Sequence, residues 1–450
     1  MVIEATPATD RITKAERIVS LDVIRGIAIL FILFMNIGGM AGYTTVGDWR
    51  HVSWEFIDRA AAAVQFVFLS GTQRGLLELL FGAGIMIMAR RAMTPDGPVA
   101  IADLHYRRNL LLILFGLFNA LILLWPGDIL LPYGIAALFL FPFRLLKPRR
   151  QLILGGVFLL LAMTSTVNWY YERSQAQAAA QQVASAASAG RTVDEETKEL
   201  AQKWDEAVQM SLPLAKSPEK QKKLAEERAI RHGPLPSYAL FLWGEWAEDF
   251  KPMDFFPWLA EIAGTMLIGM ALFQWGIIQG RARRRTYWAL LLVGYSVGLS
   301  LRAFMLTEAF AFSPEPTLVW LYWEPARIAT TLGHVAAIHL ILGSNVGRRL
   351  LAPFQAPGRM PLTTYLFTSF LTMWVLFPGF GLGLHGSFSW SGMMAVAATI
   401  IAVEVVATNF WLRTHETGPM EWLWKSLAYG HRQPYRRVYA PAAPVPVPAE

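Results

Sequence analysis

Long apolar stretches recur along most of this chain, and their length is the first structural signal. A helix that crosses the hydrocarbon core of a bilayer needs roughly 20 mainly apolar residues. Windows of that kind predict membrane-spanning helices near residues 24–43, 72–90, 109–125, 129–146, 151–170, 256–279, 286–305, 317–343, 360–378 and 391–412. We therefore expect an all-α, polytopic membrane protein with about ten transmembrane helices.

The charges of the connecting segments give the orientation of these helices. Clusters of arginine and lysine occur in every second loop and in the C-terminal tail, at 90–91, 107–108, 147–150, 281–285, 348–349 and 425–437. The alternate short loops, 125–128, 311–316 and 377–389, contain neither residue. By the positive-inside rule, both termini are predicted to be cytoplasmic, which agrees with an even number of helices.

Residues 171–250 break the apolar pattern. They are rich in alanine and glutamine at first, and then dense in both charges from Asp194 to Arg231. Glu195 and Lys198 lie at a helical spacing there, so we expect an external loop that is a helical hairpin or partly disordered. The predicted regions are an N-terminal transmembrane region (1–170, five helices), the external loop (171–250), a C-terminal transmembrane region (251–430, five helices) and a Pro-rich cytoplasmic tail (431–450).

Composition agrees with the pattern and removes several classes of function. Of 450 residues, 54% are hydrophobic and 16% are charged, which is not the composition of a soluble enzyme. No cysteine is present, so disulfides, thiolate metal sites and a cysteine acyl carrier are excluded. The net charge of +7 comes from arginines at helix ends, so we expect a lipid bilayer and no nucleic acid as partner. The chain has no phosphate-binding loop or zinc-protease motif, and no metal is expected.

Polar side chains inside the first predicted helix are candidates for function, because such groups are costly in a bilayer. Asp22 and Arg25 lie one turn apart and can pair, either as an ion pair at the membrane border or as part of a site. Asn36 follows eleven residues after Arg25, roughly 16 Å deeper, near or just beyond the bilayer midplane. It either bridges helices or contacts a substrate.

After this helix, His51 opens the sequence His51-Val-Ser-Trp54 in an external loop. Histidine can take and give a proton near neutral pH, so His51 is a candidate general base. The alternative is a solvated loop residue.

Other ionisable residues lie in later helices. Arg74 and Glu78 are four apart and can pair, whereas Glu261 and Glu404 stand alone in their helices. Glu324 and Arg327 are expected to form a buried pair, as structural links between helices or as pocket lining. His334 and His339 are expected to be helix-packing residues.

Two sets of motifs resemble the bacterial YeiB-like inner-membrane proteins, whose C-terminal half is a domain of unknown function. The first set is Arg17-Ile-Val-Ser-Leu-Asp-Val-Ile-Arg25-Gly26 with Asn36, then Leu80-Phe-Gly-Ala-Gly84 and Trp125-Pro-Gly-Asp128. The second is Pro357-Gly-Arg359-Met-Pro-Leu-Thr-Thr-Tyr365, followed by 381–384 and 418–430. The resemblance implies a multi-pass protein of the bacterial inner (cytoplasmic) membrane.

The Leu-Asp-Val-Ile-Arg25-Gly segment is also similar to the entrance of two groups of membrane acyltransferases. In the type 3 acyltransferases, a histidine follows the arginine at the position that Asn36 occupies here. The heparan-alpha-glucosaminide acetyltransferases resemble this chain more closely, with asparagine at that position and a catalytic histidine in a context like His51-Val-Ser-Trp54. The interval between Asn36 and His51 is a few residues longer than in that group.

Some positions depart from the YeiB-like pattern. Asn119 stands where relatives often have histidine, and Thr364 and Thr368 replace an expected asparagine and glutamine. If the family reaction needs those side chains, this chain differs in substrate or activity.

These observations predict a membrane acyltransferase, and the resemblance implies acetyl-coenzyme A as the donor. Arg25, supported by Asp22, would hold the donor's phosphates at the cytoplasmic mouth. Asn36 would donate a hydrogen bond to the thioester carbonyl, and His51 would take a proton from an acceptor at the external face.

Further residues are expected around this site. Glu78 or Asp128 would orient His51, and Glu324, Arg327 and Arg359 are expected to line the pocket. The acceptor is a small molecule or a glycan, and a second copy of the chain is a candidate partner.

The main alternative is a transporter or exporter of a small organic or lipid-linked molecule. Its support is the set of charges inside the predicted helices, which can form a midplane site or a proton relay: Glu261, Arg302, Glu324, Arg327 and Glu404. A scaffold without catalysis is a third interpretation, and it predicts that Arg25, Asn36 and His51 can be replaced without effect.

Overall fold

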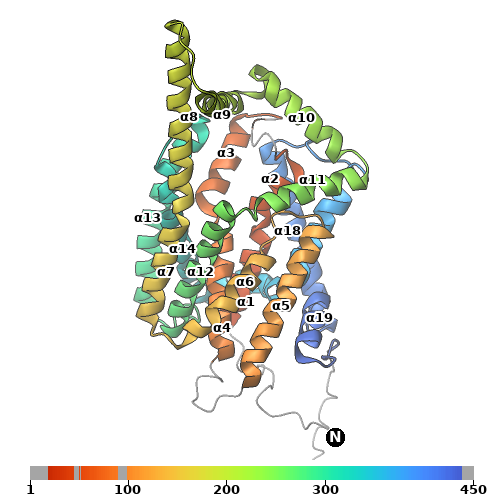
Figure 1. Ribbon diagram of the computed structural model, residues 1–450. Helices are drawn as coiled ribbons and strands as arrows, with labels where there is room; N and C mark the ends of the chain where they lie inside the picture. The colour runs from red at the N-terminus through yellow and green to blue at the C-terminus, as the bar shows by residue number, and fades with distance from the viewer. Residues whose placement is uncertain (1–18, 45–49, 51, 90–98, 438–450) are drawn as a thin grey trace, which may run out of the picture.

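The computed structural model describes residues 19–44, 50, 52–89 and 99–437, which fold into a helical bundle with a helical cap at one end (Figure 1). The described part holds no β-strand, and a single bridge pairs His415 with Arg436. Its first helices are α1 (Val19–Phe31), α2 (Leu33–Ala41), α3 (Phe56–Val64), α4 (Thr72–Ala89), α5 (Val99–Leu121), α6 (Leu130–Leu140) and α7 (Pro148–Ala162). Then follow α8 (Thr164–Ser188), α9 (Glu195–Ser211), α10 (Pro218–Arg231), α11 (Leu235–Glu248), α12 (Pro252–Gln274) and α13 (Arg284–Ala311). The last are α14 (Trp323–Leu342), α15 (Asn345–Leu351), α16 (Gln355–Arg359), α17 (Pro361–Phe370), α18 (Trp390–Thr414) and α19 (Pro419–Tyr429).

Six helical stretches in the described residues are long and apolar enough to cross a membrane: Val19–Ala41, Pro148–Ser188, Pro252–Gln274, Arg284–Ala311, Val319–Leu342 and Trp390–Thr414. Each overlaps one of the spans predicted from the sequence. Two further predicted spans are shorter apolar helices, Leu130–Leu145 and Pro361–Leu376, and the remaining two correspond to α4 and α5. The all-helical membrane fold is confirmed, whereas the count of ten spans stays a prediction.

Helices α1 and α2 form a central spine that is interrupted near Ile32. At its start the spine packs against α16 at very short range, since a Cβ atom on Gly26 would lie 1.9 Å from the carbonyl oxygen of Phe354. A Cβ atom on Gly358 would likewise lie 1.7 Å from the carbonyl oxygen of Asp22. Only glycine permits this approach of two backbones, and it joins the two motifs quoted above.

A second close contact joins α4 to α12 in the middle of the bundle. A Cβ atom on Gly82 would lie 1.9 Å from the carbonyl oxygen of Met266, and one on Gly269 would lie 2.3 Å from that of Leu79. The crossing therefore places neighbouring polar side chains of α4 and α12 within hydrogen-bonding reach.

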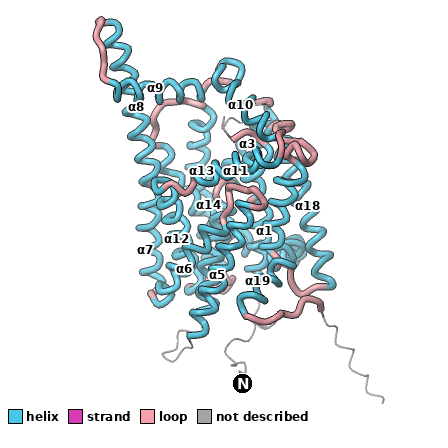
Figure 2. The backbone as a smooth tube through the Cα atoms, turned by 45° about the vertical axis from the view of Figure 1, so that its right-hand side comes forward, coloured by secondary structure: helices cyan, strands magenta, loops and turns pink. Residues whose placement is uncertain are grey.

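The predicted external loop consists mainly of helices, from the second half of α8 to α11. In Figures 1 and 2, α8 projects beyond the bundle, and α9 and α10 lie across its end. Helix α11 returns to the bundle, where the Trp243 indole N–H donates to the carbonyl of Leu121 at 3.0 Å. The segment therefore packs on the bundle as a cap, because the apolar helix α11 lies against α5.

A buried polar contact ties this cap to the end of the spine. Arg231 is fully buried; its guanidinium donates to Glu227 at 3.0 Å and to the Thr44 hydroxyl at 3.1 Å. That hydroxyl donates to Glu245 at 2.6 Å. Three helices of the cap and the spine therefore meet at one cation, a link between segments far apart in the sequence.

Candidate functional site

The predicted pair of Asp22 and Arg25 is present at the start of α1. Arg25 lies 3.3 Å from the Asp22 carboxylate and donates to the carbonyl of Gly358 at 3.1 Å. Arg359, one residue further on, donates to the carbonyl of Glu416 at 3.0 Å. The fold therefore brings Asp22, Arg25 and Arg359 to the same end of the molecule, and the Arg25 side chain stays 32% exposed.

Asn36 lies in α2, where no residue is exposed. The Asn36 side chain is half-buried, and no hydrogen bond of this side chain is found within the described residues. Its neighbour Met35 accepts a hydrogen bond from the Gly71 amide at 3.0 Å. The Asn36 amide therefore keeps accessible surface that a ligand can contact.

His51 lies outside the described residues. The Arg50 guanidinium lies 3.7 Å from the centre of the Phe312 ring, and Trp54 packs edge-on against Phe310 with ring centres 5.2 Å apart. Arg50 and Trp54 are thus held against the end of α13.

The same loop is anchored to the start of α18 by Asp58. This buried carboxylate accepts hydrogen bonds from the Ser391 amide at 2.9 Å and the Ser391 hydroxyl at 2.6 Å, and from Ser53. Burial raises the pKa of Asp58, but the hydrogen bonds from Ser391 and Ser53 outweigh burial and hold that pKa well below its usual range. Asp58 therefore stays ionised and fixes the loop.

The largest polar cluster in the described bundle is centred on Arg327 of α14, which is fully buried. Its guanidinium donates to Glu324 at 2.8 Å, to Glu78 at 2.9 Å and to the Thr265 hydroxyl at 2.8 Å, and lies 3.0 Å from Glu261. The predicted pair of Glu324 and Arg327 is confirmed. One cation thus binds carboxylates from α4, α12 and α14.

Arg74 completes this cluster. It donates to Glu261 at 2.7 Å, and its Nε lies 3.4 Å from Glu78, so the predicted pair within α4 is confirmed. The Tyr133 hydroxyl lies 3.3 Å from Glu78. Glu261 has no charged partner within α12. Its two partners come from α4 and α14, which the spacing within α12 cannot indicate.

Asp128, predicted to orient His51, is buried in a separate polar group. It accepts hydrogen bonds from the Asn119 amide at 2.8 Å and from the backbone N–H of Leu131 at 2.9 Å. Tyr365 contacts the same turn, since its hydroxyl accepts from the N–H of Ile129 at 3.3 Å. The turn at 125–128 is therefore covered by neighbouring helices, with Trp125 and Asp128 both buried.

Glu404 has its partner on another helix, which the spacing within α18 cannot indicate. It accepts a hydrogen bond from the Thr368 hydroxyl at 2.5 Å. Thr368 is one of the positions that depart from the YeiB-like pattern, so this departure supplies a hydrogen bond within the bundle.

The two histidines of α14 are satisfied, as predicted. His334 lies 2.8 Å from the Tyr295 hydroxyl and 2.8 Å from the carbonyl of Phe68. His339 lies 3.0 Å from the carbonyl of Ile278. Within the described residues, no group of three His, Asp or Glu side chains is arranged to hold a metal ion.

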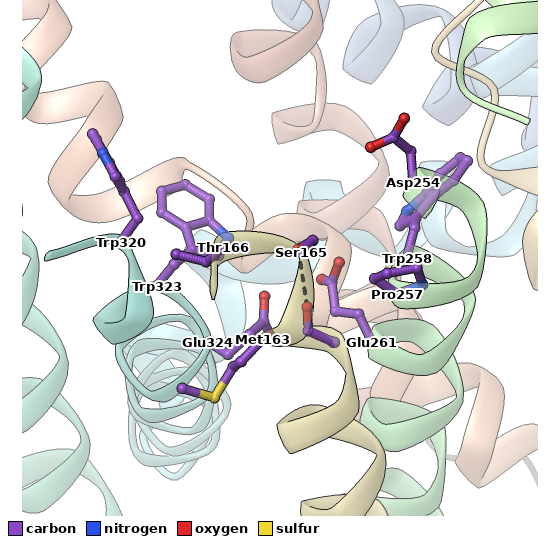
Figure 3. A pocket seen from close by; sticks show the side chains of 11 residues that line it. Met163, Ser165, Thr166, Asp254, Pro257, Trp258, Glu261, Trp320, Trp323 and Glu324 are labelled. Carbon is purple, nitrogen blue, oxygen red and sulfur yellow. Dashed lines mark hydrogen bonds between the residues drawn. The ribbon is translucent and has the colours of Figure 1, made fainter. Parts of the chain in front are cut away.

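A cavity of about 290 Å³ reaches the Arg327 cluster from the side of α7 and α8 (Figure 3). Its lining residues are Ala162, Met163, Ser165, Thr166, Asp254, Pro257, Trp258, Glu261, Trp320, Trp323 and Glu324. Of the residues predicted to line a pocket, Glu324 does so. Glu261 was named only among the charges of a transporter site. Asp254 and the three tryptophans were missed, because they come from α12, the turn at Val319–Tyr322 and α14, which only the fold brings together.

Comparisons with known proteins agree with this architecture. Residues 272–431 match a family described as a protein of unknown function, DUF418. The uncharacterized protein YxaH of Bacillus subtilis is 27% identical over 432 residues, which cover 93% of this chain and 96% of YxaH. The uncharacterized protein YeiB of Escherichia coli is 26% identical, over 92% of this chain and 96% of YeiB. No solved structure matches the chain. With a DUF418 match in its C-terminal part and similarity to YxaH and YeiB over nearly its whole length, this chain is similar to the YeiB-like proteins.

Proposed function

We propose that this protein is an integral membrane acyltransferase that moves an acyl group, with acetyl as the first candidate, from a cytoplasmic acyl-coenzyme A to an acceptor at the external face. The observation that carries the proposal is Asn36, a half-buried amide for which no side-chain hydrogen bond is found within the described residues. Its N–H donors suit the thioester oxygen on which negative charge develops during attack.

The start of the spine supports a donor site. Arg25 is held by Asp22 and by the carbonyl of Gly358, yet its side chain keeps a third of its surface exposed. A guanidinium that is oriented and accessible is suited to bind a phosphate group of coenzyme A. Asn36 lies roughly 16 Å further along the spine, a separation that the long coenzyme arm can bridge.

The chemistry requires an acceptor nucleophile and a base. The acceptor oxygen or nitrogen attacks the thioester carbon, a bond to that carbon forms, the C–S bond breaks, and coenzyme A leaves as a thiolate, which takes up a proton and becomes the free thiol. The base accepts the acceptor's proton, and His51 is proposed for this role, which typically contributes 10² to 10⁴ in rate. Asp58 supports the role indirectly, because it fixes the loop after position 51.

The test is release of free coenzyme A thiol from acetyl-coenzyme A by the purified protein in nanodiscs made from bacterial lipid. The chain contains no cysteine, so a thiol reagent reports the product without background from the protein. We expect release by the wild type, a loss of about 10²-fold or more for Asn36→Ala and for His51→Ala, and a raised KM for Arg25→Ala. Arg191→Ala, an exposed arginine of the cap, is the matched control for Arg25.

Two results of this assay would count against the proposal. Equal rates for wild type, Asn36→Ala and His51→Ala, or no thiol release with acetyl, butyryl and palmitoyl donors, would contradict acyl transfer. Calorimetric binding of acetyl-coenzyme A, compared between wild type and Arg25→Ala, separates a failed donor site from a missing acceptor.

Transport is the second candidate, and one observation favours it. The cavity of Figure 3 reaches a buried cluster in which three carboxylates face two guanidiniums, Arg74 and Arg327. One excess negative charge inside a membrane bundle is suited to a proton or a cationic solute. Uptake into proteoliposomes that depends on a proton gradient, with no thiol release, would support transport over acyl transfer.

A further inference from the structure

A second hollow lies beside the cavity of Figure 3. This groove has a volume of about 360 Å³ and runs between α7 on one side and α13 and α14 on the other. Its lining residues are Gly156, Leu159, Leu160, Met163, Leu290, Val293, Gly294, Val297, Glu324, Pro325, Ile328, Ala329 and Leu332. Every one of them is apolar except Glu324.

The groove and the cavity are neighbours. Met163 and Glu324 line both, so the single carboxylate of the groove is also part of the wall of the cavity. The apolar groove thus adjoins the polar cavity of Figure 3, which we call the chamber. Glu324 lies at the boundary between them.

The groove opens toward lipid. Leu160, Val293 and Val297 line it and are 65%, 63% and 45% exposed. They belong to stretches that are long and apolar enough to cross a membrane, Pro148–Ser188 and Arg284–Ala311. Apolar side chains exposed at this position face hydrocarbon, so the groove can admit a chain from the bilayer by lateral movement.

The chamber at the end of the groove is acidic and aromatic. Asp254, Glu261 and Glu324 line it, and lysine and arginine are absent from its lining. When Glu78 is included, four carboxylates stand near the three guanidiniums of Arg74, Arg302 and Arg327, which leaves one negative charge in excess. Trp258, Trp320 and Trp323 supply ring faces, which attract cations.

We propose that these two hollows together hold a single-chain amphiphile with a primary ammonium head, the chain in the groove and the head in the chamber. The match is one of shape and charge, because an apolar channel of the volume typical of ligand sites, about 300–1,000 Å³, leads to an anionic, tryptophan-lined end. The identification of this amphiphile as the acyl acceptor rests on the proposed function. The binding of the amphiphile in the two hollows does not rest on that function.

In that reaction the ammonium gives up its first proton to a carboxylate of the chamber, the neutral nitrogen attacks the thioester carbon, and His51 takes the second proton from that nitrogen. The C–N bond forms and the C–S bond breaks. The products are an amide, free coenzyme A thiol and one proton, so the atoms and charges balance without a further reactant.

The chamber also lies close to the spine. Trp323 of its wall would be 3.3 Å from a Cβ atom on Gly71, and the Gly71 amide donates to Met35, the neighbour of Asn36. The wall of the chamber is thus linked to the spine beside Asn36 through Gly71 and Met35.

The test uses hexadecylamine that carries a diazirine at the middle of its chain, with the full-length protein in nanodiscs. After illumination, mass spectrometry locates the labelled residues. We expect labels concentrated in 156–163 and 290–297, and at least several-fold fewer from the matching diazirine hexadecanol, which has no charge for the chamber to recognise.

Two variants make the result specific. Gly156→Phe fills the groove without a clash, since a Cβ atom there meets nothing within 4 Å, and we expect about tenfold less labelling. Gly244→Phe on α11 is the matched control, because that glycine is equally open and lies outside both hollows. Asp254→Asn, an exposed residue outside the Arg327 cluster, is expected to reduce the preference for the amine over the alcohol.

Labels spread evenly over all lipid-facing helices, or unchanged labelling in Gly156→Phe, would overturn the proposal. Labelling as expected, combined with no thiol release from acyl donors, would keep the amphiphile site and reject its role as an acyl acceptor.

Discussion

The interior of this protein contains two polar regions that differ in how their groups are paired. Around Arg327, each charged group meets an opposite charge or a hydroxyl within hydrogen-bond distance. Along the spine, Arg25 keeps accessible surface, and no side-chain hydrogen bond of Asn36 is found within the described residues. Charges placed in a membrane interior must be paired to be tolerated, so the first region is suited to hold helices together, and the second is suited to receive a ligand.

The largest expected effect concerns stability at Arg327. Arg327→Met leaves three buried carboxylates without their shared cation and is expected to cost about 3–5 kcal/mol of folding free energy. Arg25→Met removes a partly exposed pair and is expected to cost about 0–1 kcal/mol. Thermal unfolding in detergent with a fluorescent reporter measures both. Equal losses at the two sites would remove the distinction between the regions.

A pair of asparagines sharpens the comparison through activity. Asn36→Ala removes an amide without a hydrogen bond in the described residues, so we expect unchanged stability and a rate of acyl transfer reduced by about 10² to 10³. Asn119→Ala removes the amide that donates to Asp128, and we expect a stability loss of about 1–3 kcal/mol. Thiol release and thermal unfolding of the same preparations measure the two effects. A large stability loss in Asn36→Ala would show that Asn36 is a structural residue.

The glycine contact at the donor end gives a smaller effect. Gly26→Ala forces a methyl group against the carbonyl of Phe354, so α1 and α16 must separate, at a cost of about 1–3 kcal/mol. Because the Arg25 contact with Gly358 is stretched at the same time, donor affinity should fall as well. Gly84→Ala is the control, since a Cβ atom there meets nothing within 4 Å. Similar melting temperatures for both variants would mean that the close approach is not required.

The smallest effect is a dependence on pH at Asp58. Its pKa is lower in the folded protein than the value of about 3.9 for an unfolded chain. The stabilisation from the ionised group is therefore complete well above pH 4 and is lost as the pH falls toward the folded pKa. Asp58→Asn is expected to cost about 1 kcal/mol at neutral pH, and the difference from wild type should shrink below about pH 4. Denaturant titrations at pH 7 and pH 3.5 test this, and a difference that grows in acid would contradict it.

The sequence indicated the pairs that lie within one helix and missed those that join helices. Asp22 with Arg25, Arg74 with Glu78, and Glu324 with Arg327 follow from spacings of three and four residues. The partners of Glu261 lie 187 and 66 positions away in the chain, so periodicity carries no information about them.

The cavity and groove were beyond prediction for the same reason. Their walls come from α7, α8, α12, α13 and α14, and the positions of these helices depend on packing at long range. Composition and charge, by contrast, gave the helical membrane fold directly. The docking of the cap was not predicted from its charges, because it depends on contact between α11 and α5, which are far apart in the sequence.

The Arg327 cluster also limits how this protein can move. One guanidinium binds carboxylates from α4, α12 and α14, and a sliding motion of any of these helices by one turn would break at least one buried ion pair. The three helices are therefore expected to move together as one rigid body. Any opening that admits a substrate must place its hinge elsewhere. The seam between α7 and the pair α13 and α14, where the packing is loose enough to leave a groove, is the natural place for that motion.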